Sequence, residues 1–152
     1  CDGWTARDIV EHVVTTQRDF LTGQPFAPDQ IAVADPLEAW PVVRALVSAA
    51  LADPSTANHP YDGYFGPTTF AQTIDDFYSL DLVVHSWDLA TAVGLEDLRS
   101  IDPSEMVAVR ASLAKVGDML RQPGLFGPEV RVADSADEQT KFLAYVGRVS
   151  PS

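Results

Sequence analysis

Local signals that start and stop helices constrain the fold of this chain more than any other feature of its sequence. In four places a side chain that can cap a helix is followed, three residues later, by an acid. These pairs are Thr5 with Asp8, Asp35 with Glu38, Asp102 with Glu105, and Ser135 with Glu138. Such a pair satisfies backbone N–H groups that lack a partner in the first turn of a helix. Each pair therefore predicts the start of a helix.

Gly and Pro residues predict where these helices end. We expect ends at Gly23, near Ala52, near Gln122 and at Val146, and a further long helix from about Pro67 to Val93 that Gly94 closes. Residues 54–66, rich in Pro, Gly, Asn and Asp, are predicted to form a loop, and residues 128–133 an extended segment. Four long helices and a short C-terminal one predict an all-α bundle that forms a single domain over residues 1–152.

The charge balance argues against two classes of partner. The 152 residues carry 22 acidic and 10 basic side chains, a formal net charge of −12, and the basic residues are scattered from Arg7 to Arg148. Phosphate backbones and anionic membranes both require clustered cations, so we expect neither nucleic acid nor a membrane as a partner. No apolar run approaches the roughly 20 residues that span a bilayer. The single cysteine, Cys1, allows no internal disulfide, which favours a cytoplasmic protein.

The long helix predicted at 67–93 carries polar residues on its apolar side. At about 100° per residue, one side of this helix collects Phe70, Ile74, Phe77, Tyr78 and Val84. Asp81, His85 and Asp88 fall in the same sector. An ionised carboxylate on an apolar face costs several kcal/mol if it is unpaired. Because this helix contains no Lys or Arg, the cation must come from elsewhere, and a metal ion satisfies the requirement.

The spacing of these polar residues sharpens the hypothesis. Asp81 and His85 are four residues apart, which places their Cβ atoms about 5–6 Å apart on one helical face. Both side chains can then reach one ion at about 2.0–2.2 Å. His12, beside the apolar Ile9 and Val13 of the first helix, is the candidate third ligand from a facing helix. Three protein ligands leave a position for water or substrate, and Asp88 is placed to accept a hydrogen bond from a ligand imidazole.

Structural roles explain the same residues without a metal. Asp81 and His85 can form a buried hydrogen-bonded pair, Asp88 can pair with an arginine of another helix, and His12 can be a core or surface histidine. The aromatic residues of the stripe are packing residues by default. We expect His59, in the predicted loop, to be exposed and inert, and Cys1 to be a poor nucleophile because nothing holds a base beside it.

Three segments resemble a known family when they are taken together. CDGWTARDIVEHVV, DLVVHSWDLATAVGL and FGPEVRVADSADEQTKFLAYVGR occur in this order. They resemble the metal-binding domain of mycothiol-dependent maleylpyruvate isomerases, within the DinB-like superfamily, and in particular its stand-alone members without a second domain. The resemblance covers essentially the whole chain. It implies a DinB-like four-helix bundle with a short additional C-terminal helix, and a zinc or nickel ion held by His12, Asp81 and His85.

The resemblance also implies a function. In family members of known activity, the metal activates a low-molecular-weight thiol such as mycothiol, which attacks an electrophilic small molecule. The leading hypothesis is therefore a thiol-dependent transferase or isomerase, with the substrate walled by Phe70, Phe77 or Tyr78. The first alternative is a non-catalytic bundle that binds a metal or small ligand, which Asp88 as a fourth ligand would favour. The second is metal-dependent hydrolysis with Asp88 or Glu11 as base.

Two departures from the family pattern shape these expectations. Family members have a helix before the CDGW motif, and the sequence printed here lacks it. We therefore expect either that the chain is truncated, or that the helix predicted from Asp102 to Gln122 or a neighbouring subunit takes its place. The exposed apolar face that would otherwise result favours a homodimer. The isomerases also carry a C-terminal domain that has no counterpart here, so isomerase activity itself is not implied.

Overall fold

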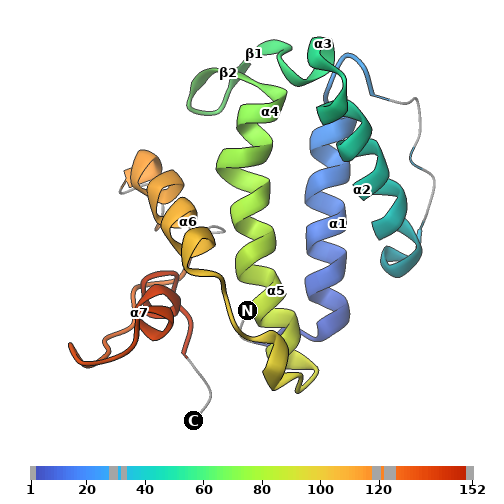
Figure 1. The fold of residues 1–152 in the computed structure, drawn as a ribbon. Helices are drawn as coiled ribbons and strands as arrows, with labels where there is room; N and C mark the ends of the chain where they lie inside the picture. The colour runs from blue at the N-terminus through green and yellow to red at the C-terminus, as the bar shows by residue number, and fades with distance from the viewer. Residues whose placement is uncertain (1–2, 28–30, 32–33, 118–120, 122–125, 150–152) are drawn as a thin grey trace. The chain divides into compact units, whose positions relative to one another are not determined.

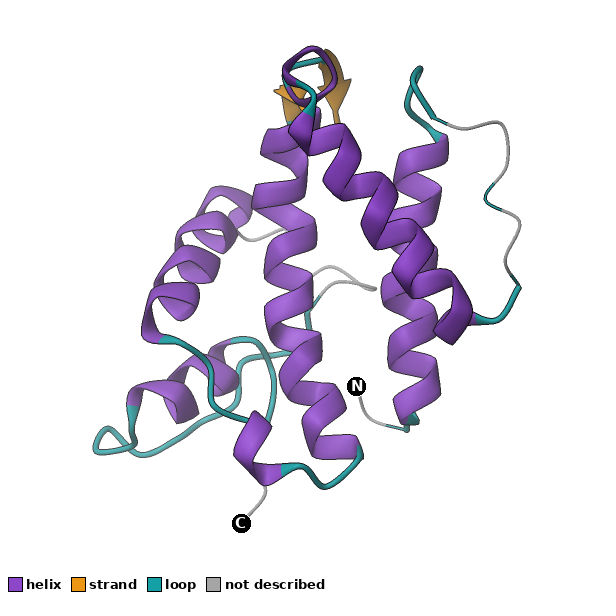
Figure 2. Ribbon diagram, turned by 45° about the vertical axis from the view of Figure 1, so that its right-hand side comes forward, coloured by secondary structure: helices purple, strands orange, loops and turns teal. Residues whose placement is uncertain are grey.

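The computed structural model describes residues 3–27, 31, 34–117, 121 and 126–149. These residues are mostly helical, with one small two-stranded sheet (Figures 1 and 2). The chain divides into two compact units, Cys1–Arg99 and Ser100–Ser152, which are described separately below. Among the described residues, no helix combines the length and apolar character needed to cross a membrane. A single domain and a DinB-like four-helix bundle both stay predictions.

The first two helices begin and end as their capping residues predict. Helix α1 spans Ala6–Thr22, helix α2 spans Pro36–Ala52, and Gly23 follows α1 as its C-cap. The backbone N–H of Thr5 donates to the Asp8 carboxylate at 2.7 Å, and the Thr5 hydroxyl accepts from the Asp8 N–H at 3.3 Å. This reciprocal pair is a capping box, so the start of α1 is held by contacts within four residues of sequence.

The core of the first unit lies where α1, α2 and α4 (Phe70–Thr73) meet. Helix α1 packs against both α2 and α5 (Leu80–Ala92). The buried cluster comprises Val14, Leu21, Ala39, Val43, Phe70 and Ile74. Phe20 of α1 stacks on Phe70 with ring centroids 5.3 Å apart. None of the buried residues of this cluster comes from α5, which packs on α1 in a second contact region.

The predicted loop at 54–66 contains regular structure. It begins with the short helix α3 (Pro54–Ala57) and continues into an antiparallel hairpin of β1 (Pro60–Gly63) and β2 (Gly66–Thr69), with Pro60 opposite Thr69. The all-α prediction is therefore wrong in this segment. Gly66 has φ +109°, a conformation that other residues rarely adopt. A glycine at this position therefore lets the chain turn tightly between the two strands.

The predicted long helix starts later than expected and is not uniform. Thr69 caps it, so it begins at Phe70 instead of Pro67. Between α4 and α5 lies a π-helical segment, η1 (Ile74–Ser79), and the three segments follow one another as a single column (Figure 1). A π-turn holds more residues per turn than an α-turn, so it rotates the later residues relative to the earlier ones. One helical wheel therefore cannot describe the whole column.

In the described part of the second unit, two α-helices pack against each other. Helix α6 spans Pro103–Val116 with Asp102 as its N-cap, and helix α7 spans Glu138–Tyr145 with Asp137, not Ser135, as its N-cap. Gly117 ends α6 earlier than the predicted end near Gln122, which itself lies outside the described residues. The predicted extended segment at 128–133 forms no strand, although the Val130 N–H donates to the Ala144 carbonyl at 2.9 Å.

Candidate metal centre

Helices α1 and α5 bring His12, Asp81 and His85 together. The Nε2 atom of His85 lies 3.3 Å from one carboxylate oxygen of Asp81. The Nε2 atom of His12 lies 3.8 Å from the other oxygen. One potential ligand atom from each residue can be chosen so that all three lie within 4.8 Å of one another. The three residues that the sequence selects thus form one group in the structure.

The separations of these donors fit a divalent ion. Bonds of about 2.0–2.2 Å around a tetrahedral zinc ion place its ligand atoms about 3.3–3.6 Å apart. The imidazole nitrogens lie 3.3 and 3.8 Å from different oxygens of Asp81, and one donor atom from each residue lies within 4.8 Å of the others, so the side chains would have to close slightly around an ion. Two imidazoles and a carboxylate suit zinc and nickel alike. The donor set is therefore that of a three-ligand site with room for a further ligand.

Asp88 sits on the far side of the His85 ring from the donor group. Its carboxylate lies 2.9 Å from Nδ1 of His85, and the two side chains are only 5% and 8% exposed. A carboxylate in this position takes the N–H of Nδ1 and leaves Nε2 free to bind an ion. Asp88 does not belong to the group of donors that can share one ion. Its geometry is that of an orienting residue, not of a fourth ligand.

The charges in this cluster are strongly coupled. Burial acts to raise the pKa of Asp81, but hydrogen bonds from His12 and His85 outweigh it and lower the pKa to about 2. Burial likewise acts against a charged His85, yet hydrogen bonds to Asp81 and Asp88 raise its pKa to about 9. Without a metal, a protonated His85 therefore bridges two carboxylates. An ion that binds Nε2 must displace that proton.

These shifts predict how the stability of the metal-free protein depends on pH. The pKa of His85 lies above its ordinary 6.5, so its contribution is complete below pH 6.5 and is lost as pH rises through about 9. The pKa of Asp81 lies below its ordinary 3.8, so its contribution is lost only as pH falls towards about 2. We expect the free energy of unfolding, measured with urea and a chelator, to fall by roughly 1–3 kcal/mol between pH 6.5 and 9.5. A His85→Gln variant that shows the same fall would contradict this assignment.

Trp4 covers both imidazoles, and the sequence reasoning missed it. Its ring lies 5.1 Å from the ring of His12 and stacks on the ring of His85 at 6.2 Å, with an interplanar angle of 12°. Trp4 is 42% exposed, so it lies between the cluster and solvent. Its position could have indicated this contact. Trp4 directly precedes the N-cap of α1, and an apolar residue there commonly packs back onto the first turns of the helix.

The aromatic residues predicted to wall the substrate pack elsewhere. Phe70 is completely buried in the core. Phe77 stacks on Phe65 of the hairpin at 5.3 Å, and Tyr78 stacks on Phe20 of α1 at 4.8 Å. Burial raises the pKa of Tyr78 to about 12, as expected for a phenol enclosed by protein. Phe70 in particular offers a substrate no surface, and a role for these rings in substrate binding stays a prediction.

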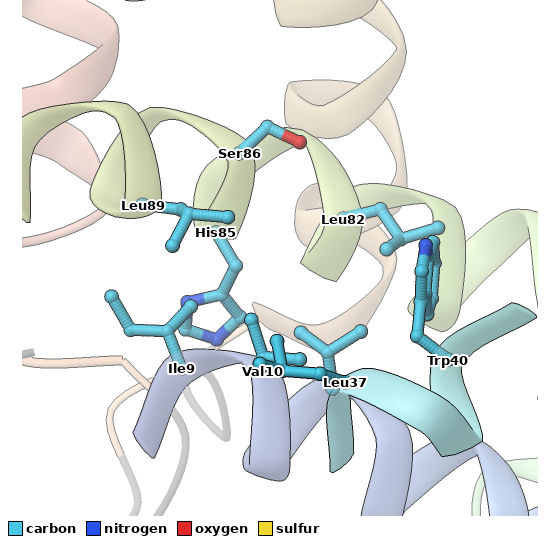
Figure 3. A pocket seen from close by; sticks show the side chains of 9 residues that line it. Ile9, Val10, Leu37, Trp40, Leu82, His85, Ser86 and Leu89 are labelled. Carbon is cyan, nitrogen blue, oxygen red and sulfur yellow. The ribbon is translucent and has the colours of Figure 1, made fainter. Parts of the chain in front are cut away.

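An apolar groove of about 230 Å³ lies beside His85. It is lined by side chains of three helices, among them Ile9, Val10, Leu37, Trp40, Leu82 and Leu89. Figure 3 shows the His85 imidazole extending between the side chains of α5 and those of α1. His85 therefore belongs both to the donor group and to the wall of the groove. In the sequence, Leu82 and Leu89 are seven residues apart, a spacing that indicates a second apolar face on this helix.

The remaining candidate residues lie apart from the cluster or outside the described residues. Glu11 is exposed on α1. His59 is half-buried, not exposed as predicted, and its ring meets Phe26 edge-to-face at 6.0 Å. Cys1 lies outside the described residues.

Comparison with known proteins adds no identification. No protein family, no curated protein and no solved structure matches the chain. Function must therefore be argued from the site itself.

Proposed function

We propose that this protein binds one divalent ion, zinc or nickel, through His12, Asp81 and His85, and uses it to activate a small thiol of the mycothiol type. The thiol would then be transferred to an electrophilic small molecule, which makes the protein a thiol-dependent transferase or isomerase. The observation that carries the proposal is the donor group itself, in which two imidazole nitrogens lie 3.3 and 3.8 Å from one carboxylate. The resemblance of the flanking segments to a thiol-dependent family supplies the reaction class.

The charges of the donor group support activation of a thiol. One carboxylate and two neutral imidazoles leave a net charge of +1 on a divalent site, which favours an anionic thiolate over a neutral thiol. A bound ion supplies Lewis acidity that lowers the pKa of a thiol at the open position. Asp88 holds His85 in the tautomer that this requires, and Trp4 limits the access of water to both imidazoles.

A non-catalytic metal- or ligand-binding bundle is the second candidate. It is supported by the fact that His85 pairs with both Asp81 and Asp88 without an ion. Structural zinc sites usually take four protein ligands. The donor group has three members among the described residues, and this favours the open, catalytic alternative.

Thiol activation can be tested with cobalt in place of zinc. In a Cys1→Ser background, which removes the protein's own thiol, mycothiol added to the cobalt-loaded protein should produce sulfur-to-cobalt charge-transfer absorption. The zinc-loaded protein should accelerate the reaction of mycothiol with a chromogenic aryl halide by about 10- to 30-fold at pH 7, because a few per cent of a free thiol is ionised at that pH. A His12→Ala variant serves as the control. A metal-loaded protein that shows neither effect would exclude the thiol-dependent function and leave the non-catalytic one.

A further inference from the structure

The groove beside His85 has no role in the function proposed above. Helix α5 presents Leu82, Ser86 and Leu89 to it, and these residues form a second stripe beside the one that carries Asp81. His85 belongs to both stripes. An occupant of the groove would therefore touch the ring whose Nε2 atom takes part in the donor group (Figure 3).

The chemistry of the lining selects an uncharged ligand. No Asp, Glu, Lys or Arg is among the described residues that line the groove, and the polar atoms of its side chains belong to His85, Ser86 and the indole N–H of Trp40. Residues 1–99 carry four basic and fifteen acidic side chains, a formal net charge of −11. An anion would be repelled by this charge and would find no cation in the groove. A second copy of this unit would bring a like charge of the same size against the groove, so the charge also favours a small molecule over a protein partner.

The size of the groove limits the ligand further. An apolar cavity of roughly 150 Å³ holds one benzene molecule. A volume of about 230 Å³ is larger, and it suits one aromatic ring with a short substituent or an aliphatic chain of similar size. A small number of polar groups in an otherwise apolar concavity is typical of small-molecule sites.

We propose that this groove binds the uncharged, apolar part of the electrophilic substrate, an aromatic ring or an aliphatic chain of similar size. The proposal rests on the function proposed above, because it assigns the ligand to the metal centre that His85 shares. It makes the ring of His85 a wall of the substrate site as well as a metal ligand. The polar, reacting part of the substrate would lie outside the apolar lining.

Benzyl alcohol is a suitable probe, with benzoate as its anionic counterpart. We expect benzyl alcohol to shift the indole N–H signal of Trp40 in ¹H–¹⁵N spectra, with saturation at a Kd of about 1–10 mM. Benzoate should bind at least about tenfold more weakly, because of the acidic surroundings. The Trp40 signal is assigned with a Trp40→Phe variant, and the metal content of each sample is measured in parallel.

Two variants test whether the probe occupies the groove. Val10→Phe fills it, and Leu37→Glu places a charge at a residue that is 61% exposed, where we expect the substitution to leave the fold intact. Each should weaken the binding of benzyl alcohol at least about tenfold. Val42→Phe, on the same helix as Leu37 but outside the groove, is the matched control and should bind normally.

The outcomes separate this proposal from the function on which it rests. Metal-loaded protein that does not bind benzyl alcohol, or binds it equally in the Val10→Phe and Leu37→Glu variants, overturns the proposal and leaves the metal function intact. A dimer that Leu37→Glu dissociates, without probe binding, overturns it in favour of a second copy. Probe binding that the two variants weaken supports the groove as a ligand site. If the same samples bind no metal, the proposed function fails, and with it the assignment of that ligand to the metal centre.

Discussion

Replacing His12 with alanine is expected to reduce the bound metal from about one equivalent per chain to almost none. His12 is the only one of the three donors that α1 supplies, and without it the ion keeps two ligands from α5. We expect the affinity for zinc to fall by more than about 100-fold, since a ligand contributes more than the residues that orient it. Mass spectrometry of metal content and competition with a chromophoric chelator measure both quantities.

The controls for this experiment follow from the positions of the histidines. The side chain of His12 is 33% exposed, so its truncation leaves little cavity, and the far-ultraviolet circular dichroism should not change. His59→Ala removes a half-buried histidine that contacts Phe26 and should leave the metal content unaltered. His85→Ala should match His12→Ala in metal loss, with an added loss of stability because His85 is buried. Full metal retention in His12→Ala would contradict the site.

Replacing Asp88 with asparagine is expected to weaken zinc binding by about 10- to 100-fold without changing its stoichiometry. The amide oxygen can still accept the hydrogen bond from Nδ1 of His85, so the ring should keep its orientation. What is lost is the negative charge that makes His85 a better ligand. The zinc affinity of the variant, measured at pH 7 by chelator competition, gives the size of this effect.

Asp75→Asn is the matched control for the Asp88 variant. Asp75 is exposed in η1, so the substitution makes the same change in net charge on the same helical column. Its zinc affinity should stay within about twofold of the parent, as expected for a screened surface charge. Equal affinities in the parent and the Asp88→Asn protein would show that Asp88 has only a structural role. A loss of stoichiometry would instead make it a direct ligand.

Local interactions explain what could be predicted from the sequence. Thr5 and Asp8 satisfy each other's hydrogen bonds within one turn, so the start of α1 does not depend on the rest of the fold. Asp81 and His85 lie within the regular part of α5, where a separation of four residues always places side chains on one face. The pairing of these two residues was therefore predictable, and so was the placement of Asp88 near His85.

Contacts between distant segments explain the errors. The hairpin is a local exception: only Tyr64 and Phe65 join β1 to β2, and the Pro- and Gly-rich composition of 54–66 was interpreted as a loop. The π-helical segment η1 then changes the phase of the column, so Phe77 faces Phe65 of the hairpin while Tyr78 faces Phe20 of α1. A uniform helical wheel places Phe77 with the core residues, whereas its ring stacks on Phe65 of the hairpin.

The sequence by itself determined the starts of α1, α2 and α6, the Asp81–His85 pair and the type of donor atoms, because each depends on residues within about one turn of one another. Only the tertiary structure decided that His12 lies 3.8 Å from Asp81, since that distance depends on how α1 packs against α5. The tertiary structure also decided that Trp4 stacks on His85 and that a groove lies beside His85. Each is made by side chains from segments far apart in the sequence, and packing in three dimensions is what sets their separation.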